Sequence, residues 1–146
     1  MWNLNKGFLV VVLGCFGASC ATLPSIKHKE YAFPREAYPG IPDRPYEVIG
    51  SVRSKENFPT LDPEIDQAFL CRNYFNKAVL KLVRDSKRVG ADAVIDIKSV
   101  IFLMDGRSEA HSSAECYDDG AEGQVLARGL AVKWLKSPEK DRNATN

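Results

Sequence analysis

The chain has 146 residues, of which 45% are hydrophobic and 27% are charged, so it is long enough for one domain with a hydrophobic core and some additional segments. Its 20 basic residues nearly balance its 19 acidic residues, which gives a formal net charge of +1. Proteins that bind nucleic acid usually carry a basic excess, so this balance argues against nucleic acid as a partner.

The N-terminal segment has the order of a secretory signal peptide. Lys6 precedes an apolar run over residues 7–16, which is too short to span a bilayer but has the length of a signal-peptide core. Small residues occupy positions 17–19, and Cys20 follows, as in the site where lipoprotein signal peptidase cuts before a cysteine that receives acyl chains such as palmitate. We therefore expect a lipoprotein signal peptide at residues 1–19 and a membrane anchor through lipid on Cys20.

Two alternatives for this segment stay open, namely cleavage at another site and an uncleaved anchor. Cys15 is a weaker candidate for lipidation because the apolar run before it is very short. Residue 21 is Ala rather than Asp, which by resemblance to sorted lipoproteins of Gram-negative bacteria favours the outer membrane, facing the periplasm.

Residues 20–45 combine the lipidated cysteine with a proline-rich linker that contains five of the eight prolines. Proline restricts its own φ and the residue before it, so we expect an extended, helix-free spacer. Tyr31, Phe33 and Tyr38 lie among these prolines, and aromatic residues are common interface anchors. They are either ordinary linker residues or contacts to a partner. Composition alone favours the first interpretation, because it cannot show a partner. As a hypothesis, we predict that any partner contact lies on these linker aromatics, with the loop at 104–122 as the alternative contact site.

The folded domain is expected over residues 46–136. Residues 46–53 are rich in β-branched and aromatic side chains and predict a strand, and the polar residues 54–61 predict a loop. Asp62 has the features of a helix N-cap because proline and an acid follow it, and apolar residues then recur at helical spacing. Gly90 is placed to end this helix, which would be about 27 residues or roughly 40 Å long.

Two more strands are predicted after the helix, at residues 91–102 and 124–134, with a Gly-, Ser- and acid-rich segment between them. Two topologies remain open for that segment. Residues 109–116 form a third strand that runs back along the second, or the second and last strands pair directly. Residues 137–146 have no apolar pattern and are expected to form a disordered tail.

Three short motifs carry a resemblance to known proteins: Ile49-Gly50, the run Arg88-Val-Gly-Ala-Asp-Ala-Val-Ile95, and the run Gly123-Gln-Val-Leu-Ala-Arg-Gly-Leu-Ala-Val-Lys133. In these the chain resembles the YbjQ family and RcsF-like small envelope lipoproteins over residues 45–135. The resemblance implies an α+β fold in β-α-β-β order, with one long helix packed on a small antiparallel sheet. Gly129 and Ala131 in the last strand are small, which leaves room for a helix to cross the sheet.

Cys71 and Cys116 form an even pair inside the domain, and an oxidising periplasm favours a disulfide between them. Their separation depends on which of the two topologies holds. The resemblance favours direct pairing of the last two strands, which brings the intervening loop close to Cys71. It also matches Cys116-Tyr117 to a disulfide-bonded Cys-Tyr pair in RcsF, whose partner cysteine lies just after the first strand. The alternative is a free thiol at each position.

No nucleophile motif, phosphate loop or dinucleotide fingerprint is recognisable, and the two histidines, His28 and His111, lie in expected linker and loop segments. We expect a non-enzyme without a cofactor. Members of the YbjQ family have been described as heavy-metal-binding, but the nearby potential ligands do not have the spacing of a zinc site. Those ligands are His111, Glu115, Cys116, Asp118 and Asp119. Asn143 begins an Asn-Ala-Thr sequon in the tail, which is a possible glycosylation site.

The sequence therefore predicts an outer-membrane lipoprotein whose domain binds an envelope protein or senses envelope stress. Two alternatives remain: a structural lipoprotein that self-assembles into a homo-oligomer, and a metal-binding domain.

Overall fold

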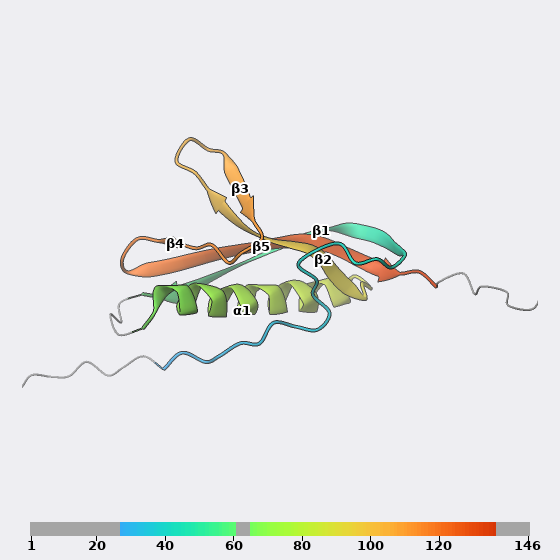
Figure 1. Ribbon diagram of the computed structural model, residues 1–146, viewed down its shortest axis with the longest axis horizontal. Coiled ribbons are helices and arrows are strands. Elements are labelled where there is room, and N and C mark those ends of the chain that lie inside the picture. Colours follow the sequence, from blue (N-terminus) through green and yellow to red (C-terminus); the bar gives the residue numbers. More distant parts are fainter. Residues whose placement is uncertain (1–26, 61–64, 137–146) are drawn as a thin grey trace, which may run out of the picture.

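The computed structural model describes residues 27–60 and 65–136, and its elements follow in the order β1, α1, β2, β3, β4 and β5 (Figure 1). The predicted signal peptide, Cys20, Asp62 and the predicted tail with Asn143 lie outside these residues. Among the described residues, no helix combines the length and the apolar character needed to cross a bilayer.

One helix packs on a five-stranded antiparallel sheet, which confirms the predicted α+β fold. The strands lie in the order β1-β5-β2-β3, and β4 pairs with β5 beside this path. Figure 1 shows α1 along one face of the sheet, and the β2–β3 hairpin rises from the other side. We call the sheet face without the helix the uncovered face.

β1 covers Tyr46–Pro59 and therefore includes the polar residues that were predicted to form a loop. The prediction was wrong because these residues alternate between the two faces of the sheet. Ser54 and Phe58 are buried, and the Ser54 hydroxyl donates a hydrogen bond of 2.6 Å to the carbonyl of Ala78 in the helix. β1 pairs with β5 as far as Pro59 opposite Glu122. The contact between β1 and α1 thus includes polar side chains such as Ser54 as well as apolar ones such as Phe58.

α1 covers Gln67–Arg88 and is shorter than predicted. Its N-cap is Asp66, whose carboxylate accepts a hydrogen bond of 3.0 Å from the backbone N–H of Ala68. The predicted end is confirmed: Gly90 has a φ of +84°, a conformation that other residues rarely adopt. The N–H groups of Gly90 and Ala91 donate to the last turn of the helix, which satisfies carbonyls that would otherwise lack partners.

The segment after the helix contains both arrangements that the sequence left open. β2 (Ala93–Phe102) pairs directly with β5 (Glu122–Trp134), and β3 (Ser108–His111) also runs back along β2. β4 (Tyr117–Asp118) adds a short pair at the start of β5. The sheet therefore has two strands more than the β-α-β-β order predicted.

The larger part of the core lies between α1 and the sheet, and a smaller cluster lies on the uncovered face. Ala93 is paired with Val132, and both belong to the smaller cluster, whereas Val94 points toward the helix. Gly129 was predicted to leave room for the helix, but its nearest neighbour is β2. A Cβ at this position would lie 2.6 Å from a methyl carbon of Val94, so Gly129 makes room for β2 rather than for the helix.

Residues 27–45 differ from the predicted free spacer because they pack on the domain. We call this segment the strap. Figure 1 shows the strap running along the side of α1 that faces away from the sheet and then passing β2. At β2 the strap is hydrogen-bonded to the strand: the Tyr38 N–H donates to the Val94 carbonyl at 2.9 Å, and the Val94 N–H donates to the Glu36 carbonyl at 2.9 Å. The prolines keep the strap free of helix, while tertiary contacts hold it in place.

Candidate functional site

The strap is held on α1 by a buried asparagine. The side chain of Asn73 accepts a hydrogen bond of 2.7 Å from the Tyr31 N–H and donates one of 2.8 Å to the Lys29 carbonyl. Asn76, one turn later, donates to the Tyr31 carbonyl at 2.8 Å. Asn73 is only 3% exposed, so both of its polar groups need these partners. Further along, Lys87 forms an ion pair of 2.6 Å with Glu36.

The three aromatic residues proposed as partner contacts do not form one surface. Tyr31 lies beside Tyr74 of α1, with ring centroids 6.2 Å apart. Tyr38 packs edge-on against Trp134 at 5.7 Å, within the smaller cluster on the uncovered face. Phe33 is the most open of the three, with 36% exposure. The structure therefore uses Tyr31 and Tyr38 for contacts inside the domain, and their role toward a partner stays a prediction.

Tyr74 links the strap, the helix and β1. Its ring stacks on Phe58 with the centroids 4.6 Å apart, and its hydroxyl lies 3.0 Å from Nδ1 of His28 in the strap. This environment removes part of the water around the phenol. Burial therefore raises the pKa of Tyr74 above its ordinary value.

A disulfide joins Cys71 at the start of α1 to Cys116 in the segment between β3 and β4, with the Cα atoms 5.7 Å apart. This confirms the predicted bridge. The buried Ser99 hydroxyl supports the same segment, because it donates to the Glu115 carbonyl at 2.7 Å and accepts from the Glu115 N–H at 3.1 Å. The segment is thus fixed both to the helix and to the central strand β2.

The bridge also affects the metal-binding alternative. Cys116 is bonded to sulfur, so it offers no thiolate from the ligand set considered above. Within residues 27–60 and 65–136, no three His, Cys, Asp or Glu side chains are grouped closely enough to hold a metal ion. The second histidine, His111, lies 3.7 Å from the Glu109 carboxylate at the edge of the sheet.

Large apolar side chains are exposed where the β2–β3 hairpin leaves the sheet. Phe102 at the end of β2 is 64% exposed, Tyr117 in β4 is 61% exposed, and Met104 in the turn is fully exposed. An open pocket lies between the hairpin and β5, and its lining includes Phe102, Tyr117 and Leu126. We call Phe102, Met104 and Tyr117 the apolar hairpin residues. Exposed apolar groups concentrated in one place are typical of contact sites.

A row of three cations crosses the centre of the uncovered face. Arg128 of β5 is directly opposite Arg53 of β1 on one side and Lys98 of β2 on the other. Like charges at directly paired positions destabilise a sheet. Lys98 has an acidic neighbour in Asp96, at 3.4 Å, but neither arginine has an ion-pair partner among the described residues. An acidic group placed on this row would relieve the repulsion. Asp96 itself has a φ of +50° at the irregularity in β2.

Comparisons with known proteins bear on the fold. No family model and no curated protein matches the chain. Among solved structures, the chain is similar to a crystal structure of a protein of unknown function from Pediococcus pentosaceus that belongs to the DUF74 family. The TM-score is 0.50 and the identity is 15%, over 68% of this chain and 96% of the other. The similarity supports the α+β arrangement and carries no functional information.

Sequence reasoning missed the apolar hairpin residues and the cation row for different reasons. The apolar hairpin residues had a signal, because the run Val100-Ile-Phe-Leu-Met104 continues past the length of the strand into a turn. The cation row had none, since Arg53, Lys98 and Arg128 become neighbours only through the strand register.

Proposed function

We propose that the chain is a lipoprotein of the cell envelope that is anchored through lipid on Cys20. Its domain acts as a non-enzymatic binding or stress-sensing module. The contact surface in this proposal is the uncovered face with the apolar hairpin residues. The observation that carries it is the exposure of Phe102, Met104 and Tyr117 beside the cation row. A partner with an acidic, partly apolar surface fits this combination, because it would cover the apolar residues and pair with Arg53 and Arg128.

The strap limits where such a partner can be. Because residues from 27 onward pack on the domain, only the seven steps from Cys20 to residue 27 remain as a spacer. A chain of this length spans at most about 25 Å when fully extended. A domain anchored in this way stays next to the membrane surface, so the partner is expected to be a membrane-attached or membrane-proximal envelope protein.

Site-specific photo-crosslinking in cells tests the contact surface. A crosslinker at Met104 is expected to capture an envelope protein, while one at Leu80 of α1, which is exposed on the opposite side of the sheet, serves as the control. A crosslinker at Phe33 tests the strap hypothesis in the same experiment. Capture from Phe33 and none from Met104 would refute the hairpin as the contact and restore the strap.

The anchor is tested separately. Cells treated with an inhibitor of lipoprotein signal peptidase are expected to accumulate the unprocessed chain, and Cys20→Ser is expected to prevent lipidation. Normal processing under the inhibitor would exclude the lipoprotein interpretation.

A second function is favoured by the outer edge of β1. This strand has 14 residues and no strand partner on one side among the described residues. Unpaired edges of this length can add a strand from another chain. The alternative is therefore a structural lipoprotein that self-associates through β1. The native mass of the purified protein separates the two functions, because a monomer favours partner binding and a closed oligomer favours assembly.

A further inference from the structure

The nearly neutral chain separates its charges into two regions. α1 contains six basic residues and one acidic residue, Asp85. The segment 104–122 has the opposite balance, with Arg107 as its one lysine or arginine against six acidic residues. Two of these acids, Asp105 and Glu109, lie in the β2–β3 hairpin, which rises on the side of the sheet away from α1 (Figure 1). The other four lie between β3 and the start of β5, in the part of the chain that the disulfide joins to the start of α1.

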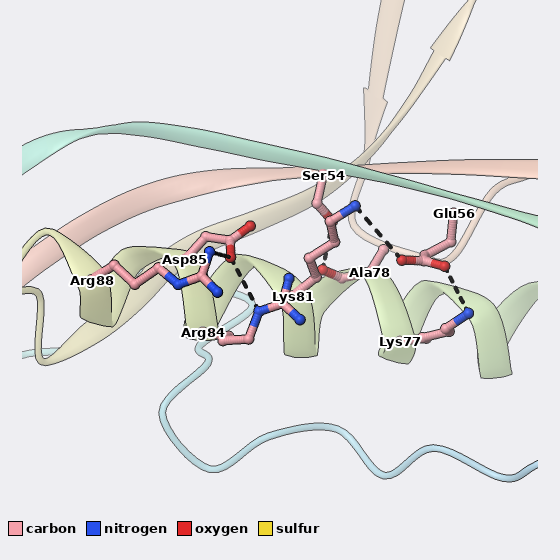
Figure 2. Close-up of polar contacts among 8 residues, drawn as sticks. All are labelled: Ser54, Glu56, Lys77, Ala78, Lys81, Arg84, Asp85 and Arg88. Carbon is pink, nitrogen blue, oxygen red and sulfur yellow. Dashed lines mark hydrogen bonds and ion pairs between the residues drawn. The ribbon is translucent and has the colours of Figure 1, made fainter.

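Four of the basic residues form a stripe along α1. Their spacing of four, three and four residues places them on one side of the helix. We call this set the basic stripe: Lys77, Lys81, Arg84 and Arg88. Figure 2 shows Lys77 and Lys81 directed toward Glu56 of β1, and Arg84 and Arg88 around Asp85.

The two acids do not neutralise the stripe. Glu56 is enclosed by its partners, with only 16% of its side chain exposed, whereas the side chains of Arg84 and Arg88 are 59% and 70% exposed. One carboxylate is shared by two cations in each case. The stripe therefore presents excess positive charge to its surroundings.

The strap enters on the same side of the molecule. Lys27 precedes His28, which contacts Tyr74 of α1, and the carbonyl of Lys29 accepts a hydrogen bond from Asn73. Lys29 and Lys77 lie 5.7 Å and 5.6 Å from the ring centroid of Tyr31. The strap that leads to Cys20 therefore begins on the basic side of the domain. The spacer keeps the start of the strap within about 25 Å of Cys20.

We infer that the α1 side of the domain, with the basic stripe and the start of the strap, lies on anionic lipid headgroups. This inference rests on the lipid anchor of the proposed function. A short anchor raises the local concentration of the domain at the bilayer, and each Lys or Arg near an anionic surface adds attraction. The uncovered face and the apolar hairpin residues then point away from the membrane, where a partner can reach them.

The test uses the complete protein, reconstituted into vesicles of phosphatidylcholine or of an equimolar mixture with phosphatidylglycerol. Mass spectrometry measures the rate of lysine acylation at Lys81 in the basic stripe and at Lys55 on the uncovered face. Phosphatidylglycerol is expected to slow acylation of Lys81 by about fivefold or more, and 1 M salt should abolish the effect. Acylation of Lys55 should not change. Equal slowing at both lysines, or slowing at Lys55 alone, would overturn the inference, as would no slowing at either.

Matched double variants locate the charges responsible. Arg84→Gln with Arg88→Gln should remove most of the protection of Lys81. Arg53→Gln with Arg128→Gln removes the same charge from the uncovered face and should leave the protection intact. The opposite pattern would mean that the uncovered face meets the lipid.

An unlipidated Cys20→Ser protein separates this inference from the anchor. Mixed with the same vesicles at high lipid concentration, it should still show slower acylation of Lys81 in the presence of phosphatidylglycerol. If the natural protein carries no acyl chains on Cys20 but Lys81 is still protected by phosphatidylglycerol, the anchor alone is refuted. If the protein is acylated on Cys20 but Lys81 is not protected, the orientation alone is refuted.

Discussion

Replacing Asn73 with alanine should release the first part of the strap from α1 while leaving the domain folded. The side chain of Asn73 makes two hydrogen bonds to the strap, to the Tyr31 N–H and the Lys29 carbonyl. The second part of the strap depends on different contacts, because Tyr38 is held by backbone hydrogen bonds to β2. Release should therefore stop before Tyr38.

The expected magnitude follows from the two lost hydrogen bonds. Each contributes about 1 kcal/mol net, so the free energy of opening the strap at Tyr31 should fall by about 2 kcal/mol. This corresponds to an increase of about 30-fold in the population of the open form. The freed N–H and C=O groups of the strap can then form hydrogen bonds with water, so their release leaves no buried polar group without a partner in the strap.

Native-state hydrogen exchange measures this opening directly. In Asn73→Ala the Tyr31 amide should exchange about 30-fold faster, while exchange at the Tyr38 amide stays within a factor of about two. Asn57→Ala is the matched control, because Asn57 is exposed on β1 and its loss should change neither amide. Unchanged exchange at Tyr31 would refute the role of Asn73, and equal acceleration at both amides would show that the strap opens as one unit.

Three further predictions concern stability. Replacing Cys71 and Cys116 by alanine opens a bridge with a sequence separation of 45, which should lower the free energy of unfolding by about 4 kcal/mol in the chain-entropy estimate, and an unchanged urea midpoint would contradict this. Because burial raises the pKa of Tyr74, its contribution is present below the ordinary tyrosine pKa of about 10 and declines as pH rises through the folded value. Tyr74→Phe should therefore flatten the loss of stability above pH 10, and identical pH profiles would exclude this cause. Gly129→Ala places a Cβ 2.6 Å from a methyl carbon of β2 and should lower the free energy of unfolding, measured with urea, by about 1–3 kcal/mol. Gly50→Ala is the control that should not show this loss, because no heavy atom lies within 4 Å of its new Cβ.

Local signals in the sequence determined much of the fold. Gly90 was recognised as the end of the helix because a left-handed residue at this position has a simple sequence signature. The apolar patterns of β2 and β5 placed both strands to within about two residues. The bridge between Cys71 and Cys116 was predicted from an even cysteine count in an oxidising compartment together with the family resemblance.

Only the tertiary structure decided the features that depend on distant partners. Residues 54–59 are polar and contain a proline, yet they form a strand because β5 supplies hydrogen bonds and α1 accepts Ser54 and Phe58. The strap has the composition of a spacer, yet Asn73 and the edge of β2 hold it. Composition reports what a segment can do alone, whereas these segments are fixed by groups that are distant in the chain, such as Ala78 for Ser54 and Asn73 for Tyr31.

The candidate contact surface shows the same division. The sequence identified the segment 104–122 as an alternative site, but it did not show that Phe102, Met104 and Tyr117 are exposed or that Phe102 and Tyr117 line the same pocket. The sequence does not distinguish the three cations of the row from other charged surface residues. The register of three strands places them side by side, with Arg128 between Arg53 and Lys98. Periodicity along the chain determines which side of a strand a residue occupies, and only the pairing of strands determines which residues become neighbours across the sheet.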